Sequence, residues 1–274
     1  MLARGETPLV LSLPHTGTRI PEPYAERFVS PWLARKDTDW WVEQLYEAAT
    51  ALDITTLRTT ISRSVIDVNR DPDGHSLYPD LATTELCPTT TFDGEPLYRG
   101  GLEPSADEIR ERCARWFVPY HQTLVGEVRR LRRQHARVVL LDAHAIRSEI
   151  PRLFDGLLPH CSIGTHGGAS CDPALTKAVE SLCDASVFSR VTNGRFRGGQ
   201  ITRRYGQPVA GVHALQLELA FRGFLAEVPG PVFAGDWPVP FDAARARPMR
   251  ALVSSILLAA IAFATTTHSA GADA

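Results

Sequence analysis

The stretch that decides the fold is Arg137-Val-Val-Leu-Leu-Asp-Ala-His144. Its continuous, β-rich apolar run is typical of a strand that is buried on both faces of a sheet, and it leads directly into polar residues. Two further predicted strands behave in the same way: residues 8–13 lead to His15, and residues 64–68 lead to Asn69-Arg70. Because ligands of open α/β sheets bind beyond the carboxyl ends of the strands, these polar residues should meet at one edge of the sheet.

Predicted helices and strands alternate through the rest of the chain. The helices are expected at residues 38–52, 106–135, 173–183 and 243–266, and the remaining strands at 53–58, 161–165 and 215–219. Asp37 is placed to cap the first helix, and Pro119 should kink the second. With no internal repeat or linker, the pattern predicts one domain over residues 1–274 with a three-layer, doubly wound α/β fold built on a mixed sheet.

Residues 79–104 form the longest segment without a periodic pattern. Thr, Pro and Gly dominate this segment, and its length is unusual for a structureless connection in a compact domain. Long connections of this kind are commonly functional loops or lids. We therefore expect residues 79–104 to form an active-site loop.

Composition narrows the class of protein. The 274 residues are 44% hydrophobic and carry a formal net charge of −2, so a broad basic field for nucleic acid is missing. The arginines at 129, 130, 132 and 133 are interpreted as a solvated helix face. Five cysteines without C-x-x-C spacing favour a reducing, cytoplasmic location over a disulfide framework or a thiolate zinc site. The apolar stretch 251–264 is too short to span a bilayer, so no membrane partner is expected.

Several polar residues at the predicted strand ends suggest a metal-assisted hydrolase. A catalytic zinc takes about three protein ligands and keeps one position open for water, and His15 and His144 would supply two of the ligands. The third should be an acid, for which Asp37 and Asp39 are the candidates, although both would also serve as helix caps. Glu218 lies amid apolar neighbours, where a charge is costly unless it is paired or used, and it is the candidate general base. The alternative for Glu218 is the exposed side of an alternating strand.

The candidate substrate-binding residues are Arg63, Asn69 and Arg70. A planar guanidinium binds a small carboxylate through two hydrogen bonds, which points to an acidic substrate. The alternative is surface ion pairing with Asp67, Asp71 or Asp73. The segment 195–199, Arg-Phe-Arg-Gly-Gly, could form a backbone nest near an anion, but it lacks the spacing of a phosphate-binding loop.

Taken together, these motifs resemble those of the N-formylglutamate amidohydrolases, and especially the deformylases of histidine degradation. The matching stretches follow one another through most of the chain: Leu13–Gly17, Asp37–Trp40, Ser62–Pro72, Phe92–Tyr98, Leu141–His144, Ile201–Arg203 and His213–Glu218. The resemblance implies a zinc-exopeptidase (phosphorylase/hydrolase-like) architecture and the hydrolysis of N-formyl-L-glutamate to formate and L-glutamate. The sequence departs from the family pattern at Ala145, where a serine is usual, and at Gln200 and Arg204.

The resemblance also implies roles for individual residues. His15 and His144 would bind Zn²⁺, with Asp37 as the first choice and Asp39 as the second choice for the carboxylate ligand. Glu218 would act as the general acid and base. The substrate-binding group would comprise four residues, of which Arg70 would also be catalytic by steadying the oxyanion: Arg63, Asn69, Arg70 and Arg203.

Two other functions remain compatible with the sequence. One is an amidase or carboxypeptidase for another N-acyl amino acid or a small peptide, in which residues 79–104 would form a cleft wall. The other is a catalytically inactive protein that binds acidic amino acids. Retention of His15, His144 and Glu218 favours an enzyme over the second alternative.

Overall fold

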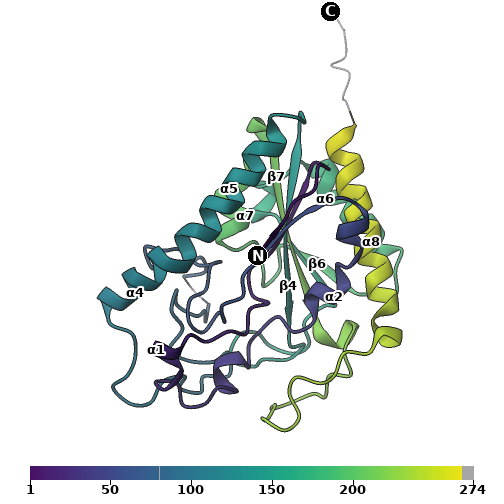
Figure 1. Ribbon diagram of the computed structural model, residues 1–274. Helices are drawn as coiled ribbons and strands as arrows, with labels where there is room; N and C mark the ends of the chain where they lie inside the picture. The colour runs from purple at the N-terminus through teal and green to yellow at the C-terminus, as the bar shows by residue number, and fades with distance from the viewer. Residues whose placement is uncertain (80, 267–274) are drawn as a thin grey trace, which may run out of the picture.

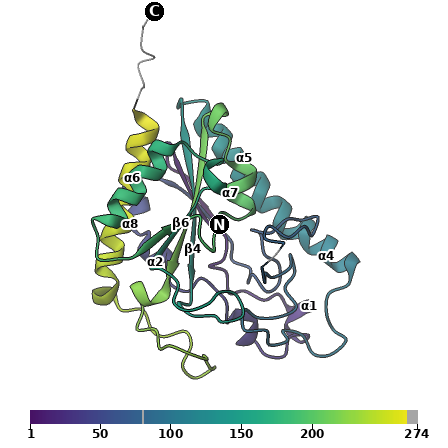
Figure 2. The same ribbon diagram turned by 180° about the vertical axis from the view of Figure 1, so that it is seen from behind.

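The computed structural model describes residues 1–79 and 81–266, which form a seven-stranded mixed sheet with helices on both faces (Figures 1 and 2). The strand order is β1-β3-β2-β4-β7-β5-β6. In chain order the strands are β1 (Leu2–Ala3), β2 (Leu9–Leu13), β3 (Thr55–Arg58), β4 (Val138–Ile146), β5 (Cys161–Gly164), β6 (Arg190–Thr192) and β7 (Val212–Ala220). Strands β3, β2, β4 and β7 are parallel, whereas β1 and β5 run antiparallel to their neighbours β3 and β7. The predicted doubly wound α/β fold with a mixed sheet is confirmed.

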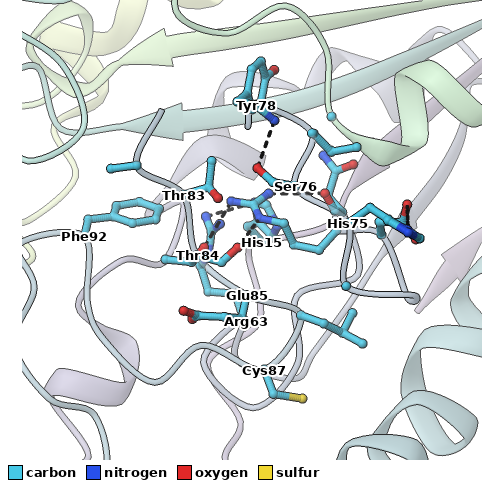
Figure 3. Close-up of a pocket in the computed structure, with 18 of the residues that line it drawn as sticks. His15, Arg63, His75, Ser76, Tyr78, Thr83, Thr84, Glu85, Cys87 and Phe92 are labelled. Carbon is cyan, nitrogen blue, oxygen red and sulfur yellow. Dashed lines mark hydrogen bonds and ion pairs between the residues drawn. The ribbon is translucent and has the colours of Figure 1, made fainter. Parts of the chain in front are cut away.

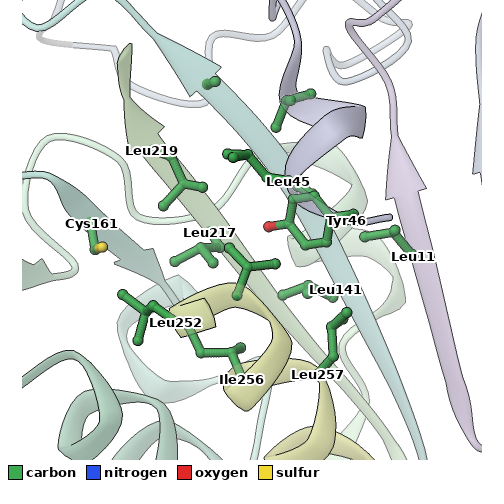
Figure 4. Close-up of a cluster of buried hydrophobic side chains, with 14 of the residues drawn as sticks. Leu11, Leu45, Tyr46, Leu141, Cys161, Leu217, Leu219, Leu252, Ile256 and Leu257 are labelled. Carbon is green, nitrogen blue, oxygen red and sulfur yellow. The ribbon is translucent and has the colours of Figure 1, made fainter. Parts of the chain in front are cut away.

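One face of the sheet packs against α2, α3, α6 and α8. These helices comprise Val42–Leu45, Ala48–Ala51, Pro173–Asp184 and Ala243–Thr265. Figure 4 shows Leu11, Leu141 and Leu217 from three neighbouring strands facing Leu252 and Ile256 of α8. Each of these side chains is largely removed from water, and full burial of such a side chain contributes about 1.5–3 kcal/mol. This apolar layer holds the central strands in a fixed register.

The opposite face packs against α5 and α7, with α4 extending beyond the sheet (Figure 1). These helices comprise Val118–Arg132, Gln200–Tyr205 and Ala106–Arg112, and a one-turn α1 spans Glu22–Ala25. A π-helical turn, Cys113–Phe117, connects α4 to α5 just before Pro119. The predicted interruption of the long helix is therefore present. Its position follows from proline, which has no backbone N–H and is best accommodated in the first turn of a helix.

The register of the central strands brings polar side chains together on this second face. Ser12 pairs with Asp142, and Asp142 in turn pairs with Gln216 on β7. Two residues further along, His144 pairs with Glu218. Because paired residues of parallel neighbours point to the same side and the side-chain period is two, these residues share one face near the carboxyl ends of the strands.

Helix α8 matches the predicted C-terminal helix to within a residue. It has 23 residues and a mean hydropathy of 1.7 in its most apolar window, so by length and composition it could cross a membrane. Met249, Val253 and Leu257 are nevertheless fully or almost fully buried against the sheet and α6. Core helices of globular proteins meet the same criteria, and this packing accounts for the apolar composition of α8.

Three predicted elements are corrected by the structure. Residues 64–68 form turns and not a strand, because Val65 and Ile66 are buried by packing against distant parts of the chain and not by a sheet ladder. The predicted helix 38–52 consists of the two short helices α2 and α3. Asp37 does not cap it, since the N-cap position of α2 is Trp41. The strand predicted to stop before His144 continues to Ile146, so His144 lies within β4.

Candidate metal centre and substrate cleft

Two histidines and one aspartate converge at the carboxyl edge of β2 and β4. The Nδ1 atoms of His15 and His144 lie 3.1 Å apart, and Oδ2 of Asp39 lies 3.1 Å from Nδ1 of His144 and 3.6 Å from Nδ1 of His15. All three side chains are buried. One ligand atom from each lies within 4.8 Å of the others, so the set could hold a metal ion.

Local backbone structure explains why His15 and Asp39 meet. His15 lies two residues after the end of β2, and its carbonyl accepts a hydrogen bond of 3.1 Å from the backbone N–H of Asp39. The loop that carries His15 passes close to residues 60–61, where a Cβ on Gly17 would lie 2.2 Å from the carbonyl oxygen of Ile61. A larger residue at position 17 would therefore push the loop away, and only glycine allows this close approach.

Each histidine is oriented by a second carboxylate. Nε2 of His15 lies 2.6 Å from Oδ1 of Asp67, and Nε2 of His144 lies 3.2 Å from Oδ2 of Asp142. These contacts leave both Nδ1 atoms directed at the same point. Metal-binding histidines commonly donate their other ring N–H to a carboxylate, which fixes the ring and increases its basicity as a ligand.

The charges around this point also suit a cation. The carboxylates of Asp39, Asp67 and Asp142 surround the two imidazoles. Burial alone would lower the pKa of His144, but the carboxylates of Asp142 and Asp39 raise it well above its usual value. Burial likewise opposes ionisation of Asp39, yet His15 and His144 hold its pKa below the usual range. The centre therefore stabilises positive charge, and a neutral imidazole pair with one carboxylate is a typical donor set for a catalytic metal with an open position.

Asp37, the first choice for the third ligand, does not join this group. Its Oδ2 accepts a 2.7 Å hydrogen bond from the backbone N–H of Phe92. Burial raises the pKa of Asp37 to about 6. The structure thus reverses the predicted order of the two aspartates: Asp39 lies with the histidines, and Asp37 fixes the loop that carries Phe92.

Glu218 lies beside His144 of the candidate metal centre and is buried, with 6% of its surface exposed, so the alternative of an exposed strand residue is excluded. The side-chain amide of Gln216 donates a 3.2 Å hydrogen bond to Oε2 of Glu218 and accepts one of 2.6 Å from the backbone N–H of Gly199. Burial raises the pKa of Glu218 to about 7, although the neighbouring His144 acts in the opposite direction. A carboxyl group with a pKa near neutrality can both accept and return a proton at physiological pH.

The predicted substrate-binding residues do not all occupy the same place. Arg63 is buried next to the metal centre: its Nη2 donates to Oδ2 of Asp67 at 2.7 Å, and its Nη1 lies 3.1 Å from Nδ1 of His15. Its guanidinium lies 4.7 Å from the centroid of the Phe92 ring (Figure 3). Arg63 therefore belongs to the wall of the centre, where it could face a developing oxyanion.

Asn69 and Arg70 also lie at the cleft, whereas Arg203 does not line it. The Asn69 amide donates to Asp142 at 2.8 Å and accepts from the backbone N–H of Ile201 at 2.8 Å. Arg70 donates to the carbonyl and the hydroxyl oxygens of Thr84. Arg203 instead donates to the carbonyl of Gly198 and stacks near Tyr78.

A cavity of about 590 Å³ extends outward from the metal centre. His15, His144 and Glu218 line its inner end, and residues 71–78 and 82–87 form much of its outer wall. Figure 3 shows Tyr78, Thr84 and Phe92 around this hollow. Part of the predicted active-site loop 79–104 thus lines the cavity.

Sequence reasoning did not identify Asp67, Asp142 or Gln216 as parts of the site. Asp67 was considered only as an ion-pair partner, and Asp142 only as a strand end. Both orient a histidine, and Gln216 orients Glu218. The spacing Asp142-Ala-His144 and Gln216-Leu-Glu218 carries a usable pattern, because polar residues two apart in a buried strand must share one face.

Hydrolysis by a metal-bound water requires a ligand set with an open position, a base and a cation near the developing negative charge. The cleft has a candidate residue for each of these tasks, so fold and site together define a hydrolase with an α/β fold and a centre that could hold a metal ion. The chain belongs to the N-formylglutamate amidohydrolase family, whose family model matches residues 7–224.

Individual relatives agree with this assignment. The chain is 44% identical over 261 residues to an N-formylglutamate deformylase of Pseudomonas aeruginosa, with 95% of each chain covered. It is 42% identical over 252 residues to an N-formylglutamate deformylase of Pseudomonas putida, covering 92% of this chain and 94% of that protein.

Two solved structures share the fold. The crystal structure of an N-formylglutamate amidohydrolase from Ralstonia eutropha JMP134 superposes with a TM-score of 0.75 at 24% identity, covering 94% of this chain and 96% of that one. A gene product of Agrobacterium tumefaciens gives a TM-score of 0.70 at 16% identity, with 96% and 95% covered. The predicted family and fold class are confirmed.

Proposed function

We propose that the protein hydrolyses N-formyl-L-glutamate to formate and L-glutamate with the help of a zinc ion. The observation that carries this proposal is the convergence of His15, Asp39 and His144 beside Glu218 at the inner end of one cavity. The two Pseudomonas relatives, which cover nearly the whole chain, are named for this reaction. Nitrogen and oxygen ligands in this number suit Zn²⁺.

We assign a separate role in the reaction to each group of residues in the cleft. Zinc, when bound by His15, Asp39 and His144, would polarise the formyl carbonyl and acidify a water molecule. Glu218 would take the proton from this water and return it to the leaving amine, a role that its pKa near 7 favours. We assign the oxyanion-stabilising role to Arg63 in place of Arg70, for which it was predicted, because Nη1 of Arg63 lies 3.1 Å from Nδ1 of His15.

Substrate binding is assigned to the wall next to this centre. Arg70 lies beside Asn69, and its Nη1 is 3.6 Å from Oδ2 of Asp67, which in turn contacts His15. A carboxylate on the carbon next to the scissile amide would therefore reach the Arg70 guanidinium while the amide lies at the metal centre. The direct test is release of formate from N-formyl-L-glutamate by the purified protein, compared with an Arg70→Met variant that should lose most of its kcat/KM.

The size of the cavity favours one second candidate, an amidase for a bulkier N-acyl amino acid or a small peptide. A volume of about 590 Å³ exceeds what a formyl group and a glutamate side chain fill. N-formyl-, N-acetyl- and dipeptide substrates should be assayed side by side. Preference for the formyl compound supports the first proposal, and faster cleavage of the larger substrates supports the second.

We also propose a cytoplasmic location and a place in histidine degradation. Five free cysteines suit a reducing compartment, and the family resemblance suggests the pathway. Deletion of the gene should abolish growth on histidine as a nitrogen source and lead to accumulation of N-formylglutamate. Normal growth of the deletion strain would contradict this placement.

A further inference from the structure

Arg195 lies on the segment between β6 and α7 and lines the cavity that begins at the metal centre. Three arginines line this cavity, and two of them already have carboxylate partners. Arg63 contacts Asp67 at 2.7 Å, and Arg70 lies 3.6 Å from the same carboxylate. Among the carboxylates of residues 1–79 and 81–266, none lies within ion-pair distance of Arg195.

The environment of Arg195 favours an anionic ligand. Burial is the largest influence on the Arg195 guanidinium and lowers its pKa. The nearby positive charge of Arg70 acts in the same direction, while Tyr78 and the more distant Glu218 carboxylate offset part of this effect. A partly buried cation next to a second cation is costly unless an anion joins them. A ligand that carries a carboxylate would remove this cost, and it would gain charge-assisted hydrogen bonds at the same time.

The Arg195 side chain is also held in place before any ligand arrives. Its Nε donates to the carbonyl of Leu153 at 2.7 Å, and its Nη2 donates to the carbonyl of Ala82 at 2.6 Å. The guanidinium carbon lies 5.4 Å from the centroid of the Tyr78 ring and 5.3 Å from that of Phe196. These contacts use only two of the three guanidinium nitrogens, so Nη1 remains available to a ligand within the described part of the cleft. An arginine fixed in this way loses little conformational entropy on binding.

The two cleft arginines occupy different places relative to the metal centre. Arg70 is connected to His15 through Asp67, whereas Arg195 is anchored to Leu153 and Ala82 on the outer wall. N-formylglutamate carries one carboxylate next to the scissile amide and a second at the end of its side chain. We propose that Arg195 binds the side-chain carboxylate of the substrate and thereby selects glutamate over neutral amino acids. This inference rests on the proposed function.

The test compares N-formyl-L-glutamate with N-formyl-L-glutamine, which has the same shape but a neutral side chain. In the Arg195→Met variant, kcat/KM for N-formylglutamate should fall by about 10–100-fold, the usual range for a lost charge-assisted contact. For N-formylglutamine it should change by less than about threefold. Arg197→Met is the matched control: Arg197 is exposed, two residues along the same segment and outside the cavity, and its replacement should leave both rates unchanged.

The remaining outcomes separate a binding role from a loop-positioning role. Equal losses on both substrates in Arg195→Met would assign Arg195 to loop positioning through Leu153 and Ala82 and would overturn the inference. Arg195→Met should also slow the hydrolysis of N-formylglutamate 1-amide, which keeps the side-chain carboxylate and lacks only the carboxylate next to the scissile bond. An unchanged rate on this substrate would also overturn the inference. The Arg70→Met variant should show the reverse pattern, with discrimination at the side chain retained.

Failure of the proposed function would be recognised separately. If the wild-type protein releases no formate from N-formylglutamate, binding of L-glutamate and L-glutamine is measured by calorimetry on the zinc-loaded protein. The inference then predicts that wild type prefers glutamate and that Arg195→Met loses this preference. Equal affinity of the wild-type protein for both amino acids, or no binding of either, would overturn it.

Discussion

Exchange of Asp39 for asparagine should release the metal, whereas the same exchange at Asp37 should not. Both substitutions remove one negative charge and almost no volume, so they form a matched pair. The Asp39 carboxylate lies 3.1 Å from Nδ1 of His144. Substitution of partners outside the ligand set typically weakens metal binding by 10–100-fold, so loss of a ligand should cost more than about 100-fold.

Asp37 has a different role, and the expected effect of its substitution is correspondingly small. Burial raises the pKa of Asp37 to about 6, so folding disfavours its ionised form. Replacement of this carboxylate by a neutral amide should therefore cost little folding stability. An asparagine oxygen can still accept the hydrogen bond from the Phe92 N–H. We therefore expect Asp37→Asn to change the free energy of unfolding by about 1 kcal/mol or less and metal affinity by less than about threefold.

The assay for this pair is chelator competition on zinc-loaded protein, followed by dialysis and measurement of the metal content. Urea unfolding of each variant is the separate control for stability. Loss of metal from Asp37→Asn with retention in Asp39→Asn would refute the assignment of Asp39. Equal retention in both variants would show that neither carboxylate is a ligand.

Three further predictions follow from the supporting residues. Asp67→Asn should weaken zinc binding by about 10–100-fold in the same competition assay, because Asp67 orients His15; unchanged affinity would exclude this role. Gly199→Ala should cost about 1–3 kcal/mol in urea unfolding, because the new Cβ would lie 2.6 Å from Nδ2 of Asn69; an unchanged midpoint would contradict the close packing. Burial lowers the pKa of His121 from 6.5 to about 4. As the pH drops, the unfolded chain therefore binds a proton at this histidine before the folded protein does. The free energy of unfolding should fall between about pH 6.5 and pH 4. His121→Gln should remove up to about 3 kcal/mol of this pH dependence, and an unaltered slope between pH 7 and pH 5 would count against it.

Much of the fold follows directly from the sequence. Strands β2 and β4 begin as apolar runs that lead into polar residues, and such runs are recognisable because burial on both faces of a sheet demands them. The segment 64–68 has the same composition but forms turns. Its apolar residues are buried by contacts with distant parts of the chain, and local sequence cannot distinguish such contacts from a sheet ladder.

Site residues could be predicted from the sequence where the type of a residue limits its possible roles. They were harder to predict where the position of a residue depends on the conformation of a loop. His15, His144 and Glu218 stood out as polar residues in apolar surroundings, and the structure places them together. The choice between Asp37 and Asp39 depended on the loop after β2, in which the hydrogen bond from the Asp39 N–H to the His15 carbonyl fixes the geometry. Residues two apart in a strand point to the same side, but no such rule holds in a loop. The sequence could therefore not rank Asp37 and Asp39.

Arg203 illustrates the same limit. Its place in a matching motif suggested a substrate-binding role, whereas the structure directs its Nε to the Gly198 carbonyl and leaves it outside the cavity. Arg195, eight positions earlier, lines the cavity instead. Which arginine of a loop faces a ligand depends on the packing of Tyr78 and Phe196, residues that are distant or unremarkable in sequence.

The most direct test of the account is formate release from N-formyl-L-glutamate by metal-depleted protein, before and after addition of zinc. The account predicts no activity without metal, recovery with zinc, and loss of that recovery by at least about 100-fold in Glu218→Gln, which should still bind zinc. Formate release that does not depend on metal, or full activity of Glu218→Gln, would contradict it.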